Sequence, residues 1–110
     1  MGSIMYGHPQ ATLKFDDRVL AHLRVVIVAK LRRSEPFTLQ FGTESRTTAG
    51  STVVWFHPSI PLQFTFSGGR EVRLNRAWID EMMLGASSNG GLVLGSEPEL
   101  TALPATTVAE

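Results

Sequence analysis

Residues 16–33 read DDRVLAHLRVVIVAKLRR, and this stretch decides the fold. Asp16 or Asp17 is a suitable N-cap, because an aspartate side chain accepts hydrogen bonds from free backbone N–H groups and its charge suits the positive helix end. A helix from about Arg18 to Arg33 places the larger aliphatic residues on one side, with the period of 3.6 residues that marks a core-facing stripe. That stripe consists of Val19, Leu20, Leu23, Val26, Ile27 and Leu31.

A second apolar row lies on the same predicted helix, outside the core-facing stripe. It consists of Ala21, Val25 and Val28, which are spaced four and three residues apart. β-branched residues are mediocre helix formers, so a solvent-facing helix has no local reason to place valines there. Either a second layer of the same chain or another subunit is expected to cover this row. We therefore treat these three residues as a candidate oligomer interface.

The segments on both sides of this helix alternate apolar and polar residues, as half-buried strands do. A second helix is predicted from about Arg76 to Ala86, with Asn75 as its N-cap. Strands are expected near residues 4–6, 11–15, 37–41, 52–56, 62–66 and 92–94, with a short edge strand at 71–74. The order β-β-α-β-β-β-α-β, with a three-stranded meander between the helices, predicts an α+β fold in which a mixed or mainly antiparallel sheet packs on two helices.

Composition limits the class of protein. The chain has 110 residues and no cysteine, which fits one domain and excludes a disulfide scaffold, a thiolate nucleophile and a thiolate metal site. No apolar run approaches the roughly 20 residues of a membrane span, and the N-terminus has no signal-peptide pattern. We therefore expect a cytoplasmic protein with no membrane partner.

The chain is expected to divide into a single domain, residues 1–95, and a mobile polar acidic tail, residues 96–110. The tail, SEPELTALPATTVAE, has two prolines and no base, and it cannot bury enough apolar surface to offset its ordering entropy. It contains three of the ten acids, so the domain alone carries a net charge of +3 and the tail can screen its basic surface. The alternative is a peptide that docks on a partner through Leu100, Leu103 and Val108.

Histidines, serines and acids form no recognisable catalytic pattern. His8, His22 and His57 are far apart in sequence and lack the short spacing of zinc-binding pairs. The serines lie in no Gly-x-Ser-x-Gly elbow, and residues 67–70 (SGGR) lack the Lys-Ser/Thr of a phosphate loop. The sequence therefore predicts no catalytic residue, no metal site and no cofactor.

Basic residues gather on the polar side of the first helix and again before the second helix. Arg70, Arg73 and Arg76 recur at every third position, next to Asn75 and to free backbone N–H groups that suit a phosphate or carboxylate. The alternative is that Arg73 only protects an edge strand from pairing. The candidate anion or nucleic-acid site consists of Arg18, His22, Arg32, Arg33, Arg70, Arg73, Asn75 and Arg76.

Three stretches together carry a family resemblance: residues 16–33, residues 54–62 (VWFHPSIPL), and residues 74–92, which begin LNRAW and end SNGGL. They resemble a family of single-domain actinobacterial proteins of about this length and of unknown function. Its members are frequently labelled ATP-dependent DNA ligase in genomes. The resemblance covers roughly residues 4–95 and implies membership of that family, but it brings no catalytic residues with it.

The ligase label can be compared with the residues. ATP-dependent ligases attach AMP to a lysine within Lys-x-Asp-Gly-x-Arg, and residues 14–18 (KFDDR) are the nearest match. They lack the glycine and are one residue short before the arginine, and Lys14 is expected on the exposed side of a strand. A ligase core also needs several hundred residues, so we do not expect catalytic ligation by this chain alone.

Three classes of function follow, in decreasing order of support. The first is a non-catalytic binding or assembly module that forms a homo-oligomer through the second apolar row of the first helix. The second is an accessory protein that binds nucleic acid or another anionic partner through its arginines, with Tyr6, Trp55 and Trp78 available for base stacking. The third is an enzyme with a dispersed site that the sequence does not reveal.

Overall fold

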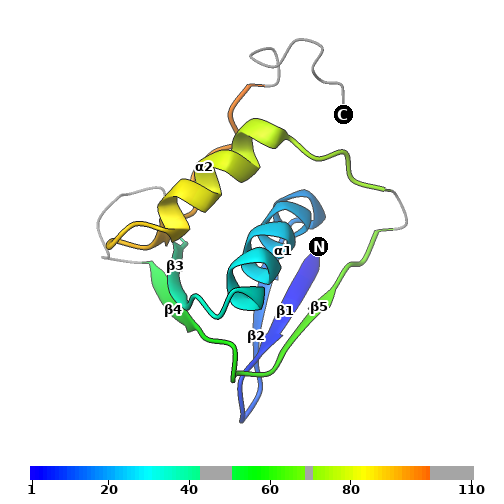
Figure 1. The fold of residues 1–110 in the computed structure, drawn as a ribbon. Helices are drawn as coiled ribbons and strands as arrows, with labels where there is room; N and C mark the ends of the chain where they lie inside the picture. The colour runs from blue at the N-terminus through cyan, green and yellow to red at the C-terminus, as the bar shows by residue number, and fades with distance from the viewer. Residues whose placement is uncertain (43–50, 69–70, 100–110) are drawn as a thin grey trace.

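A computed structural model describes residues 1–42, 51–68 and 71–99. It confirms the α+β class and the predicted order of elements (Figure 1). The elements are β1 (Gly2–Tyr6), β2 (Ala11–Phe15), α1 (Asp17–Arg32), β3 (Phe37–Phe41), β4 (Thr52–Phe56), β5 (Leu62–Thr65), α2 (Arg76–Ala86) and β6 (Leu92–Val93). Neither helix in these ranges is long and apolar enough to cross a membrane.

The strands form two three-stranded sheets rather than one. The first has the order β2-β1-β5 and is antiparallel, and the second has the order β4-β3-β6, with β6 parallel to β3. The predicted meander of three strands is therefore wrong, because β5 leaves β4 and pairs with β1. The chain crosses between the sheets where the Gly7 N–H donates to the Pro61 carbonyl at 3.1 Å and the Tyr6 hydroxyl donates to the Trp55 carbonyl.

Residues 71–74 are not the predicted edge strand. They form an extended connection from β5 to α2, which arches around α1 in Figure 1. Side chains of α1 satisfy the backbone of this connection, since Arg18 Nη1 donates to the Arg73 carbonyl at 2.9 Å and His22 Nε2 accepts from the Asn75 N–H at 2.8 Å.

The core lies between α1, α2 and the inner faces of the sheets. The predicted stripe of α1 provides Leu20, Leu23, Val26 and Ile27, which are all fully buried, while Val19 and Leu31 are half-buried. Across from them lie residues of both sheets and of α2, and α1 contacts α2 directly (Figure 1). The main apolar contributions from these other elements are Ile4, Phe15, Phe37, Leu39, Phe56, Trp78 and Met82.

The two helices begin differently. Asn75 caps α2 as predicted, because its side chain accepts from the Ala77 N–H at 3.0 Å and the Trp78 N–H at 3.4 Å. The predicted side-chain cap of α1 is wrong: Asp16 occupies the N-cap position without a side-chain hydrogen bond. Asp17 instead accepts from the backbone of Gly68 at 2.6 Å and of Ser67 at 3.3 Å, which ties the end of β5 to α1.

Candidate functional site

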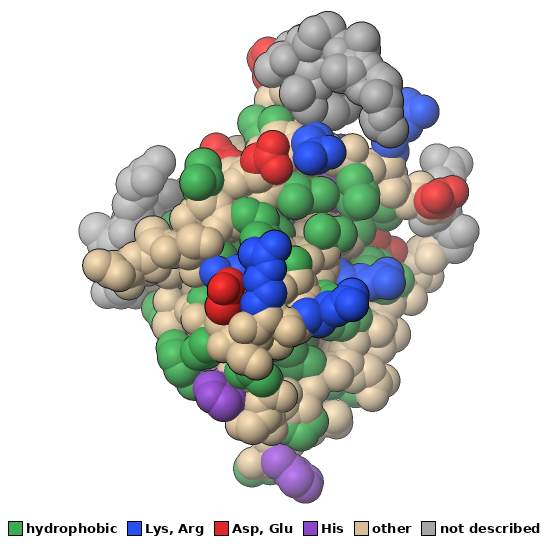
Figure 2. Space-filling model, in the orientation of Figure 1, with side chains coloured by type: hydrophobic (Ala, Val, Ile, Leu, Met, Phe, Trp, Pro, Cys, Tyr) green, Lys and Arg blue, Asp and Glu red, His purple; other side chains and the backbone are tan. Residues whose placement is uncertain are grey.

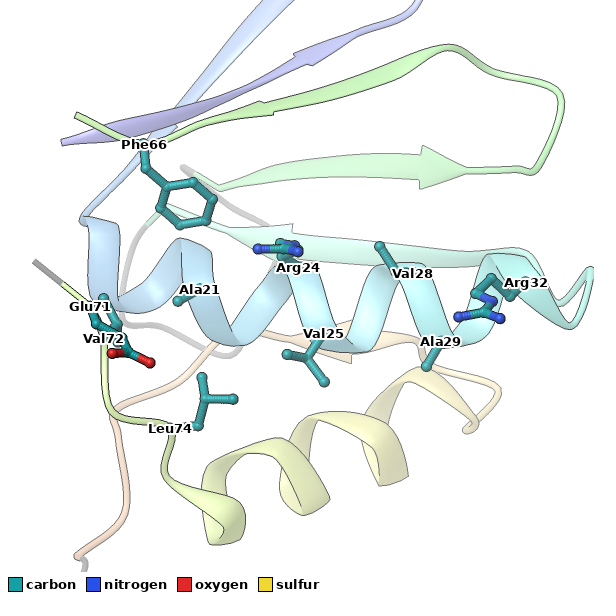
Figure 3. Close-up of a pocket in the computed structure, with 10 residues that line it drawn as sticks. All are labelled: Ala21, Arg24, Val25, Val28, Ala29, Arg32, Phe66, Glu71, Val72 and Leu74. Atoms are coloured by element: carbon teal, nitrogen blue, oxygen red, sulfur yellow. The ribbon is translucent and has the colours of Figure 1, made fainter. Parts of the chain in front are cut away.

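A groove of about 610 Å³ runs along the outer face of α1. Helical spacing places Ala21, Val25 and Val28 in its floor, since residues three and four apart lie on one side of a helix. Phe66, just after β5, forms one margin, and the connection before α2 forms the other (Figure 3). The described lining residues are Ala21, Arg24, Val25, Val28, Ala29, Arg32, Phe66, Glu71, Val72 and Leu74.

The groove exposes apolar side chains that we expected from the sequence to be covered. Val25 is 36% exposed, Val28 is 37% exposed and Leu74 is 46% exposed. Hydrophobic side chains are mixed with Lys and Arg side chains on the face shown in Figure 2, where α1 lies toward the viewer in Figure 1. Within residues 1–42, 51–68 and 71–99, the predicted second layer amounts to Phe66 at one margin and to Val72 and Leu74 at the other. The row is thus left open by the described part of the chain.

Charges of both signs stand at the groove. Arg24 lies near the middle of its length and Arg32 near one end, while Glu71 lies at the other end, beside the start of α1 (Figure 3). All three side chains are exposed. None of the three forms a hydrogen bond or ion pair with a residue in the described ranges.

A second polar cluster lies at the start of α2 and is centred on Glu97. Arg18 donates from Nε to Oε1 at 2.7 Å and from Nη2 to Oε2 at 2.6 Å, which is the paired geometry that suits a carboxylate. Asn75 Nδ2 donates to the same Oε2 at 2.9 Å and to the Pro98 carbonyl at 2.9 Å. The hydrogen bonds from Arg18 and Asn75 lower the pKa of Glu97 to about 2.

This cluster lies before α2, where the sequence predicted an anion site. Arg18 and Asn75 do come together there, with the Arg73 carbonyl accepting from Arg18, and the carboxylate that Arg18 and Asn75 hold belongs to the chain itself. Glu97 lies in the segment that we expected to be a mobile tail. Its carboxylate contacts Arg18 and Asn75 of the domain. Residues 100–110 of the predicted tail lie outside the described part of the structure. No local sequence pattern predicts this contact, because Glu97 and Arg18 are distant along the chain.

The helical period indicated that His22 lies on an exposed polar face, and this prediction is wrong. His22 is fully buried beneath the connection to α2 and lies against Trp78, with ring centroids 4.7 Å apart. Its Nδ1 bonds the Arg18 carbonyl at 2.7 Å, so Nδ1 carries the proton while Nε2 accepts from Asn75. Burial lowers the pKa of His22. The residue is a structural histidine held neutral, and it cannot contact nucleic acid from this position.

The remaining predicted site residues are dispersed. Arg33 is exposed just beyond the last turn of α1, roughly 20 Å along the helix from Arg18. Arg73 is exposed, and the 78% exposed side chain of Arg76 forms an ion pair with Asp80 at 3.7 Å. Arg70 lies outside the described residues. Arg32 belongs to the groove, so the predicted basic surface is divided among separate places.

The aromatic residues form no shared stacking platform. Trp78 is buried in the core, Tyr6 is half-buried against Phe56, and Trp55 is 50% exposed on β4. Lys14, the lysine nearest to a ligase pattern, is exposed on β2. Across the described ranges, no three histidine, aspartate or glutamate side chains come close enough to hold a metal ion.

Comparison with known proteins identifies the family. A family model described as a domain of unknown function, DUF7882, matches residues 1–97, so the chain belongs to that family. The chain matches no curated protein and no solved structure. The matched stretch contains the groove on α1 and also Glu97 with its partners Arg18 and Asn75.

Proposed function

We propose that this domain is a non-catalytic assembly module that associates with copies of itself through the groove on α1. The observation that carries the proposal is the exposure of Val25, Val28 and Leu74 along one continuous hollow. Covering apolar surface releases about 25 cal/mol for each Å² removed from water, so a row of half-exposed aliphatic side chains favours association.

Self-association is tested by light scattering coupled to size-exclusion chromatography at several protein concentrations. Val25→Glu places a charge in the middle of the row and is expected to give a monomer at every concentration. Leu84→Glu is the matched control, because Leu84 is 76% exposed on α2, outside the groove, and its substitution should leave the mass unchanged. A wild-type chain that stays monomeric at millimolar concentration would contradict the proposal.

The second candidate is binding of nucleic acid or another anion, which the net charge of +3 over residues 1–95 favours. Arg24 and Arg32 are exposed in one groove and form no ion pair with a described residue, so they are better placed for it than the other arginines predicted from sequence, which are dispersed. The resemblance to proteins labelled ATP-dependent DNA ligase supports the same candidate. Ligation itself is not proposed, since Lys14 stands on a strand without the ligase sequence pattern around it.

Anion binding is tested by fluorescence anisotropy with labelled single- and double-stranded DNA and RNA at low and moderate salt. If the arginines bind phosphates, affinity falls steeply with salt and falls again in Arg24→Ala and Arg32→Ala. Arg76→Ala is the control, because Arg76 lies outside the groove and pairs with Asp80. The absence of binding at low salt would remove this candidate.

A further inference from the structure

The groove carries opposite charges at its two ends and apolar side chains between them. Figure 3 shows Glu71 beside the N-terminal part of α1, Arg32 near the C-terminal end, and Val25 between the two. The α1 segment from Ala21 to Arg32 is roughly 16 Å long. The surface is therefore polarised along the helix rather than uniformly basic.

A surface of this kind is complementary to a second copy that is rotated by 180°, so that the two copies run in opposite directions. In a twofold dimer, a residue i of one copy that contacts residue j of the other copy has a counterpart, because residue j of the first copy then contacts residue i of the second. Every contact therefore occurs twice. If the two α1 helices run antiparallel, Glu71 of one copy meets Arg32 of the other at both ends, and Val25 lies near the axis. Parallel helices would bring Arg32 to Arg32 and Glu71 to Glu71, which is unfavourable.

We infer that the groove binds a second copy of this chain, with the two α1 helices antiparallel and two Glu71–Arg32 pairs closing the ends. The inference rests on the proposed function and adds the orientation of the copies. A polyanion fits this groove less well, because Glu71 would repel it at one end. Arg24 lies near the middle of the groove and so faces its own copy, which makes it a useful contrast to Arg32.

Two single charge reversals and their mixture test the orientation, because only antiparallel helices make each single reversal weaken the dimer. Arg32→Glu alone and Glu71→Arg alone each replace two attractive contacts by two repulsive ones, so the dimer Kd should rise about tenfold or more at low salt. Mixed in equal amounts, the two variants place opposite charges at both ends of a heterodimer. The mixture should therefore dimerise near the wild-type Kd. Sedimentation velocity with one variant labelled measures both quantities, and the double variant R32E/E71R should also recover.

Two further results separate the possible failures. Arg24→Ala should not weaken the dimer, because it removes a like-charge contact near the axis, whereas Arg32→Ala should weaken it. A dimer that Val25→Glu disrupts but that the mixed variants do not restore would overturn the antiparallel orientation and leave self-association standing. Equal weakening by Arg24→Ala and Arg32→Ala would also overturn it. A monomeric wild type would instead overturn the proposed function. Circular dichroism checks the fold, and both charge-exchanged residues are exposed.

Discussion

Two sides of α1 reverse the usual relation between polarity and burial. The side facing α2 buries His22 completely and leaves Lys30 only 5% exposed, while the groove side leaves Val25 and Val28 more than a third exposed. The buried polar groups are acceptable because each has partners: Lys30 bonds Glu35 at 3.0 Å and Ser87 at 3.1 Å, and both ring nitrogens of His22 are bonded. The exposed valines have no such compensation among the described residues, and this is the basis of the proposed association.

The largest expected effect on stability comes from removing His22, the buried residue whose two ring nitrogens are both hydrogen-bonded. His22→Ala leaves the Asn75 N–H without its acceptor and creates a cavity beside Trp78, so we expect a loss of about 2–4 kcal/mol in the free energy of unfolding. Urea denaturation followed by tryptophan fluorescence measures it. His8→Ala is the control, because His8 is exposed in a turn and its loss should cost less than about 0.5 kcal/mol. Equal stability of the two variants would show that His22 does not support this side of α1.

A smaller effect is expected at Glu97, which joins residues 96–99 to the buried side. Its pKa is about 2 in the folded chain against an ordinary 4.5, so the unfolded chain binds the proton first as the pH falls. The stabilisation is fully present above pH 4.5 and is lost between about pH 4.5 and pH 2. Glu97→Gln should cost about 1–2 kcal/mol near neutral pH.

Urea denaturation from pH 7 to pH 2.5 checks this behaviour. The stability difference between the wild type and Glu97→Gln should shrink as the pH falls below 4.5, because protonated Glu97 and glutamine are alike in charge. Glu81→Gln, on the exposed side of α2, should leave the curve unchanged. A difference that stays undiminished from pH 7 to pH 2.5 would mean that the Arg18–Glu97 pair does not form in solution.

The smallest effect on stability is expected on the groove side. Val28→Thr should change the unfolding free energy of the dilute monomer by less than about 0.5 kcal/mol, because Val28 is already 37% exposed and threonine resembles valine in shape. Val26→Thr, two residues earlier and on the buried side of α1, is the matched control, since Val26 is fully buried and an unpaired hydroxyl there should cost about 1–3 kcal/mol. Comparable losses at the two positions would mean that the groove is covered within one chain.

Much of the candidate site could be predicted from the sequence, and the errors of that prediction share one origin. The second apolar row, Ala21, Val25 and Val28, was predicted as a surface in need of a partner, and the structure places all three in the groove. The helical period also indicated that His22 is exposed. This prediction failed because a helical wheel describes one helix alone and does not include α2, which covers His22. Glu97 was missed for a similar reason: nothing in its local sequence indicates a distant arginine.

The sequence by itself determined the order of the elements, the core face of α1 and the cap of α2, because these depend on periodicity and on groups a few residues apart. Only the tertiary structure decided that β5 joins β1 rather than β4, and that residues 71–74 are an extended connection. It also decided that His22 is buried. Those outcomes depend on contacts between residues far apart in the chain, where several partners satisfy the same local pattern and the packing of the whole domain selects one.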